Sequence, residues 1–136
     1  GSITHSAGFA AVAVGLKKEI KGVGIDLESL SRSIDFKISQ HVCVYSELEW
    51  LESLTTKQAN QALRIIFSAK ESIFKCIYPG TKTYLSFKDA AVSVDETKKK
   101  FSFTIFKSIP GIVQQGFSYH GQYSEIDKML LTSVYI

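Results

Sequence analysis

The sequence has no long hydrophobic run, and this absence excludes one class of protein. A membrane-spanning helix needs roughly 18 to 20 consecutive apolar residues, whereas the longest apolar stretch, residues 7–16, has only the length of a strand. The first five residues also lack the basic flank and apolar stretch of a secretory signal. We therefore expect a cytoplasmic protein without a membrane span.

Cysteine and proline are also scarce, with two of each among the 136 residues. Cys43 and Cys76 lie in unrelated contexts without CxxC or Cys/His spacing, so the sequence gives little support for a disulfide or a zinc site. Buried free thiols fit this usage better. Low proline content together with 45% hydrophobic residues excludes collagen-like and disordered chains and indicates one globular domain.

A strong excess of one charge is missing as well. The chain has 16 basic and 13 acidic side chains, and its runs of consecutive basic residues are 98–100 and 17–18. This balance is too even for a nucleic-acid footprint, and we expect no nucleic-acid partner. Such runs are usually solvated turns, although they are compatible with a phosphate-rich cofactor or an acidic protein surface.

Strands are predicted near both ends of the chain. Residues 9–14 and 22–27 have strand patterns and are joined by a polar turn at 17–21, which predicts a hairpin. Four later stretches rich in β-branched and aromatic residues predict mostly antiparallel strands at 85–94, 101–106, 117–124 and 129–136.

Helices are predicted between these two groups of strands. Ser46 and Glu49 form a capping-box pattern, which predicts a short helix. Apolar side chains at helical spacing predict a long helix over residues 56–78, which Pro79-Gly80 would end. The fold class is therefore α+β, with an antiparallel sheet packed against the long helix.

Two acidic side chains at the end of a predicted strand form the first candidate site. The two-residue period of a strand places Asp26 and Glu28 on one face, and Ile25 and Leu27 on the other. Neighbouring carboxylates are costly unless they are solvated, protonated or bridged by a cation, and oxygen ligands suit Mg²⁺. A solvated strand end and a metal site both remain open.

Glu71 and Lys75 share a face of the predicted long helix because they are four residues apart. In isolation this pair is typical of a surface salt bridge. If Glu71 faced Asp26 and Glu28, however, a third acid would complete a Mg²⁺ site with open positions for phosphate oxygens.

Three segments together resemble one known family. GIDLE (24–28) followed by FSAKESIFK (67–75) resembles the paired signature of the 4′-phosphopantetheinyl transferases, and most of all the larger type that activates siderophore and peptide synthetases. GSITHS (1–6) resembles a further motif of that type, a Ser/Thr-His pair before a small-residue strand. The resemblance implies two similar α+β lobes with coenzyme A between them. Residues 1–20 would then be the end of the upstream lobe and 21–136 the C-terminal lobe.

The resemblance also implies a role for each matching residue. Asp26, Glu28 and Glu71 would hold Mg²⁺ against the pyrophosphate of coenzyme A. A serine hydroxyl of an acyl- or peptidyl-carrier protein would attack the β-phosphate, with Glu71 as the base. Lys75 would neutralise phosphate charge or assist proton transfer, and Lys70 would also contact coenzyme A. Thr4 and His5 would contact the 3′-phosphate.

Other functions remain open alternatives. A catalytically incomplete lobe would bind a carrier protein or a partner subunit without transferring a group. A Mg²⁺-dependent phosphohydrolase is less well supported, because no further acid or histidine stands in an evident position to activate water. Tyr78, Tyr84 and Phe87 are compatible with a pantetheine channel, a carrier-binding edge or ordinary apolar packing.

Overall fold

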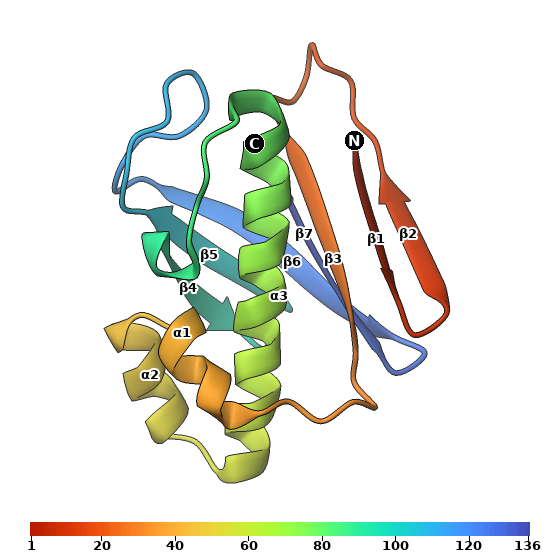
Figure 1. The fold of residues 1–136 in the computed structure, drawn as a ribbon, viewed down its shortest axis with the longest axis vertical. Coiled ribbons are helices and arrows are strands. Elements are labelled where there is room, and N and C mark those ends of the chain that lie inside the picture. Colours follow the sequence, from red (N-terminus) through yellow and green to blue (C-terminus); the bar gives the residue numbers. More distant parts are fainter.

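An antiparallel five-stranded sheet and one long helix form the two main layers of the protein. The computed structural model describes residues 1–136, and the strand order in the sheet is β3-β7-β6-β5-β4. The strands are β3 (Val23–Ser29), β4 (Ala90–Asp95), β5 (Lys100–Ile105), β6 (Ser118–Ile126) and β7 (Met129–Tyr135). Helix α3 (Thr56–Thr81) runs across one face of this sheet (Figure 1). The predicted α+β class is confirmed.

The first two strands form a separate two-stranded sheet beside β3. β1 (Ser2–Ser6) pairs antiparallel with β2 (Phe9–Ala13), so the predicted hairpin between residues 9–14 and 22–27 is wrong. Ala7 and Gly8 connect β1 to β2, and both have positive φ values, 49° and 82°. Two consecutive residues with positive φ favour a tight two-residue hairpin turn between β1 and β2. β3 pairs with β7 and not with β2.

Helix α3 extends beyond its predicted end. Thr55 and Gln58 form a capping box at its start, but Pro79 and Gly80 lie inside the helix and Lys82 ends it in a left-handed conformation. Proline lacks the backbone N–H that would bond to the carbonyl four residues earlier, so Pro79 removes one hydrogen bond of the helix, and α3 continues to Thr81 despite this loss. Pro79-Gly80 therefore did not stop the helix at Tyr78.

Short helices fill the lower end of the molecule in Figure 1, next to the start of α3. Helix α2 (Tyr45–Glu52) begins one residue before the predicted cap Ser46. The backbone N–H of Val44 donates to the Glu47 carboxylate at 2.8 Å, so Glu47 performs the capping that was assigned to Glu49. The sequence pattern had not indicated η1 (Phe36–Ile38), α1 (Ser39–Val42) or η2 (Phe87–Asp89).

The strand predictions in the second half of the chain hold with shifted boundaries. Residues 87–89 form η2, so β4 begins only at Ala90. β6 continues to Ile126, and the turn to β7 is made by Asp127 and Lys128, both with positive φ. Neighbouring strands pair antiparallel throughout, as expected.

The apolar core has two parts that share helix α3. One part lies between α3 and the sheet, and the other lies between α3, α1 and α2. Cys76 belongs to the first and Cys43 to the second, and both are buried free thiols, as predicted. No helix in the structure is both long enough and apolar enough to cross a membrane.

Gly24 allows β3 to approach α3 closely. A Cβ atom at this position would lie 2.5 Å from the Cys76 backbone nitrogen and would overlap the Ser72 carbonyl oxygen. These atoms belong to the helix backbone and cannot rotate away. The absence of a side chain at Gly24 thus sets the distance between strand and helix.

We predict that Gly24→Ala lowers the free energy of unfolding by at least about 2 kcal/mol, because the added methyl overpacks two backbones. Gly80→Ala is the matched control, since its Cβ would meet nothing nearer than 3.6 Å and alanine favours helices by up to about 1 kcal/mol. Urea unfolding of both variants measures the difference. Equal midpoints would contradict the proposed role of Gly24.

Candidate functional site

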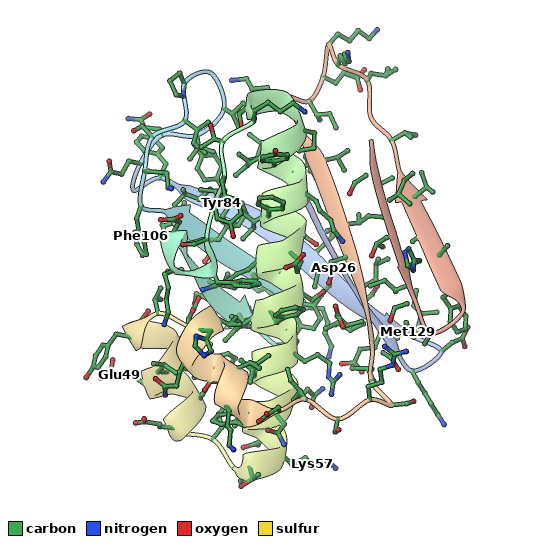
Figure 2. All side chains as sticks on the ribbon, viewed as in Figure 1. Asp26, Glu49, Lys57, Tyr84, Phe106 and Met129 are labelled. Atoms are coloured by element: carbon green, nitrogen blue, oxygen red, sulfur yellow. The ribbon has the colours of Figure 1, made fainter.

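Asp26 is the buried centre of the candidate site. Its side chain lies between β3 and α3, as Figure 2 shows, and the residue is 5% exposed. The Lys75 ammonium lies 2.7 Å from its Oδ1, and the Ser68 hydroxyl donates to its Oδ2 at 2.8 Å. Both oxygens of the carboxylate therefore have partners from α3.

Helix periodicity explains which side chains reach Asp26. Ser68 and Lys75 are seven residues apart, which is close to two full turns, so they lie on the same side of α3. On β3, the two-residue period directs Gly24, Asp26 and Glu28 toward that side of the helix. The predicted common face of Asp26 and Glu28 is therefore the face that packs on α3.

Glu28 and Glu71 complete an acidic cluster around Asp26. Burial and the nearby Asp26 carboxylate raise the pKa of Glu28 to about 7, and Glu71 adds to this shift while Arg64 opposes it. Burial and Asp26 also raise the pKa of Glu71, which Lys75 opposes. The Asp26 carboxylate thus disfavours ionisation of both Glu28 and Glu71, because like charges lie close together.

A cation would compensate this excess charge, and the donor atoms suit Mg²⁺. Asp26, Glu28 and Glu71 offer only carboxylate oxygens, the ligands that Mg²⁺ prefers. No group of three acidic, histidine or cysteine side chains is close enough to hold a metal ion as the chain stands. The donor atoms thus suit Mg²⁺, but the three carboxylates would have to move closer together to bind one ion. The positive group that contacts Asp26 in the structure is the Lys75 ammonium.

Strand β1 brings Thr4 to the same site. Thr4 is buried, its Oγ1 accepts a hydrogen bond from the Leu27 backbone at 3.1 Å, and it lies 3.5 Å from the Lys75 Nζ. Ser2 accepts from the Ile25 backbone in the same way. His5 is exposed, and strand alternation directs it to the opposite face of β1 from Thr4.

Lys70 does not lie at this site. It is 4% exposed, and its Nζ lies 2.8 Å from Glu47 Oε2 and donates to the carbonyl oxygens of Val42 and Phe87 at 2.7 and 2.9 Å. Burial lowers the pKa of Lys70, and Glu47 opposes that shift. The resemblance implies a contact of Lys70 with coenzyme A, but in the structure the three donors of its ammonium are in use elsewhere.

Comparison with known proteins identifies the family. The sequence model described as the 4′-phosphopantetheinyl transferase superfamily matches residues 22–124. The chain belongs to this superfamily. The match includes Asp26, Glu28, Glu71 and Lys75, which the structure brings together, and Lys70, which it places elsewhere.

Curated relatives extend the likeness to nearly the whole chain. The 4′-phosphopantetheinyl transferase Svp of Streptomyces mobaraensis is 32% identical over 98% of this chain and 55% of its own length. The transferase Npt of Nocardia iowensis is 30% identical over 98% of this chain and 63% of its own length. The chain thus spans somewhat more than half of these relatives.

Solved structures share the fold of this superfamily member. The holo-[acyl-carrier-protein] synthase of Thermotoga maritima matches 85% of this chain and 62% of its own, with a TM-score of 0.64 and 24% identity. The holo-(acyl-carrier-protein) synthase of Bacillus anthracis, solved in complex with CoA (3′,5′-ADP), matches 85% of this chain and 95% of its own, with a TM-score of 0.61 and 21% identity.

Next to the acidic cluster of this family member lies a mostly apolar cavity of about 130 Å³. It lies between α3 and the segment that leads into β4, and its lining includes Glu71, Phe74, Tyr84 and Phe87. Tyr84 is 70% exposed, and its ring makes a T-shaped contact with the ring of Phe74 at a centroid distance of 5.7 Å. Glu71 therefore borders both the acidic cluster and this cavity.

Sequence reasoning missed the hydroxyl side chains behind Asp26. Ser68 lies inside the motif that resembles the family, but it had been given no role. Thr132 and Ser72 are buried polar residues beside it. The available signal was a threonine in the otherwise apolar start of β7, opposite Asp26 in the strand pairing.

We predict that Lys70→Met lowers the free energy of unfolding by about 3 to 5 kcal/mol, because it leaves the buried Glu47 carboxylate without its cation. Lys57→Met is the control on the same helix, since Lys57 is exposed and should change stability by less than about 0.5 kcal/mol. Urea unfolding followed by circular dichroism gives both values. A loss in Lys70→Met no larger than in the control would overturn the structural role of Lys70.

Proposed function

We propose that this chain transfers the 4′-phosphopantetheine group of coenzyme A to a serine of an acyl- or peptidyl-carrier protein, in a Mg²⁺-dependent reaction. The observation that carries the proposal is the cluster of Asp26, Glu28, Glu71 and Lys75 in a member of this superfamily. The matched relatives are named transferases, which favours transfer over a lobe that only binds. Siderophore biosynthesis and a cytoplasmic location stay predictions from the sequence.

The acidic cluster would hold the metal. Asp26, Glu28 and Glu71 would bind Mg²⁺, which when bound supplies positive charge against the pyrophosphate of coenzyme A. The Lys75 ammonium would move partly away from Asp26 and neutralise the charge of phosphate oxygens. Thr4 already lies near Lys75. His5 is exposed on the opposite face of β1, so its contact with the 3′-phosphate stays a prediction from the sequence.

The reaction needs positioning and proton transfer more than a protein nucleophile. The serine hydroxyl of the carrier protein forms a new O–P bond with the β-phosphorus, and the bond from this phosphorus to the bridging oxygen breaks. Glu71 accepts the hydroxyl proton, and 3′,5′-adenosine bisphosphate leaves. The cavity bordered by Glu71, Phe74 and Tyr84 is suited to the pantetheine arm, because its lining is mostly apolar.

We further propose that residues 1–20 end an upstream lobe and that residues 21–136 form the C-terminal lobe. In support, β1 and β2 form a sheet of their own. Ile3 and Val12 are cross-strand partners and are 69% and 64% exposed, and Val14 is 83% exposed. An uncovered apolar face of this kind is typical of an interface with another part of a protein.

Mass spectrometry of an apo carrier protein incubated with coenzyme A, Mg²⁺ and this chain tests the activity. We predict that Glu71→Gln reduces the rate at least about 100-fold, the scale of a lost general base, and that Lys75→Ala reduces it less. Glutamine keeps the shape of Glu71 but removes its charge and its capacity to accept a proton.

Glu49→Gln is the matched control, because Glu49 is exposed on α2, away from the cluster; its rate should stay within about twofold. Equal residual rates for Glu71→Gln and Lys75→Ala would argue against Glu71 as both ligand and base. Absence of a phosphopantetheine mass gain with the unaltered chain, or an unchanged rate without Mg²⁺, would count against the proposed reaction itself.

Binding of coenzyme A tests the two-lobe proposal. We predict that the monomeric 136-residue chain binds coenzyme A with a Kd above about 100 μM. An upstream lobe would supply several phosphate contacts, each worth about 1.5 to 3 kcal/mol for a charged hydrogen bond. Titration calorimetry with Mg²⁺ present measures the affinity, and sedimentation velocity establishes that the chain is monomeric. Tight one-to-one binding by a monomer would contradict the proposal.

A further inference from the structure

Three buried hydroxyl groups continue from Asp26 into the protein interior. Ser68, Thr132 and Ser72 are each 0% exposed. Ser68 Oγ lies 2.8 Å from Asp26 Oδ2 and 2.9 Å from Thr132 Oγ1, which in turn lies 2.6 Å from Ser72 Oγ. A continuous row of hydrogen-bonding groups therefore joins β3, α3 and β7.

The hydrogen bond between Ser68 and Asp26 is the one in this row whose direction the charge of the acceptor fixes. An ionised carboxylate only accepts, so the Ser68 hydroxyl must donate to Asp26. Thr132 donates to the Ser68 carbonyl at 2.9 Å or to the Ser68 hydroxyl, and Ser72 donates toward Thr132. The other groups in the row are neutral, so Ser68 has no alternative acceptor of comparable charge.

The position of Thr132 makes this arrangement rigid. Thr132 is the cross-strand partner of Asp26 in the pairing of β3 with β7, so both side chains face α3 from neighbouring strands. Ser68 and Ser72 are one helical turn apart on α3, and both contact Thr132 from the helix side of the sheet. Neither the strands nor the helix need move for Ser68 to meet Asp26.

We propose that Ser68 is a positioning residue, which fixes the carboxylate of Asp26 in the orientation that binds the cation. The inference rests on the proposed function in one respect, namely that Asp26 is taken as a cation ligand. Lys75 holds Oδ1 through an ammonium on a flexible side chain that is 29% exposed. Ser68 holds Oδ2 through a short side chain without exposure, so Oδ2 stays fixed when Lys75 moves.

Ser68→Ala tests the proposal, and Ser72→Ala is its matched control. Both variants remove a fully buried hydroxyl from the same face of α3, and both remove a hydrogen bond to Thr132, but only Ser68 touches Asp26. The midpoint temperature of thermal unfolding should fall in both variants, and further in Ser68→Ala, because that variant also removes a hydrogen bond to the buried Asp26 carboxylate. Two further measurements separate positioning from stability.

The first measurement is a crystal structure of each variant. We expect the Asp26 carboxylate to rotate away from its present orientation in Ser68→Ala and to keep it in Ser72→Ala. The second is Mn²⁺ affinity of the 136-residue chain, followed by electron paramagnetic resonance. Loss of a hydrogen bond that orients a metal ligand typically weakens binding by about 10- to 100-fold, and we expect this for Ser68→Ala only, with less than about a threefold change for Ser72→Ala.

An unmoved Asp26 carboxylate in Ser68→Ala would overturn the proposal, as would equal losses of Mn²⁺ affinity in the two variants. A different result concerns the proposed function. If the unaltered chain binds no Mn²⁺ but Asp26 rotates in Ser68→Ala, then Ser68 positions Asp26 and the cation assignment fails.

Discussion

The close contact between β3 and α3 is the constraint on which both the fold and the site depend. Gly24 lets the strand backbone reach the helix backbone at Ser72 and Cys76. Two residues later, Asp26 reaches Ser68 and Lys75 at hydrogen-bond distance. A wider separation would leave a buried carboxylate and buried hydroxyls without partners. The free energy lost by burying such unpaired groups is larger than the net stabilisation that their hydrogen bonds provide when they form. The close packing of the two backbones at Gly24 therefore allows the Asp26 carboxylate to reach its partners on α3.

Two lysines on the same helix illustrate how position around a helix separates stability from function. Five residues correspond to about 140° around the helix axis, so Lys70 and Lys75 face different parts of the protein. Lys70 joins α3 to α2 and to the segment before β4 and is buried with Glu47. Lys75 faces β3 and remains partly exposed beside Asp26. Lys70 and Glu71 are therefore adjacent in the motif, but their side chains lie in two different regions of the protein.

The sequence predicted what depends on local periodicity and missed what depends on distant partners. The α+β class, the long helix and the shared face of Asp26 and Glu28 follow from apolar spacing and strand alternation. The pairing of β1 with β2 depends on a two-residue turn at Ala7-Gly8, and the true partner of β3 is β7, more than a hundred residues away. The burial of Lys70 depends on Glu47, which belongs to another helix. Periodicity says which face a side chain occupies, but not which element covers that face.

The charge balance of the site links its two proposed ligands. Three carboxylates lie near one ammonium, and burial together with the Asp26 carboxylate raises the pKa of both Glu28 and Glu71. The same negative field that attracts a divalent cation repels a pyrophosphate. Under the proposed function, coenzyme A therefore binds more tightly when the cation is present, and by thermodynamic linkage the cation binds more tightly when coenzyme A is present. A buried Asp26 held by Ser68 keeps that coupling strong, because fixed charges in a poorly solvated site are weakly screened.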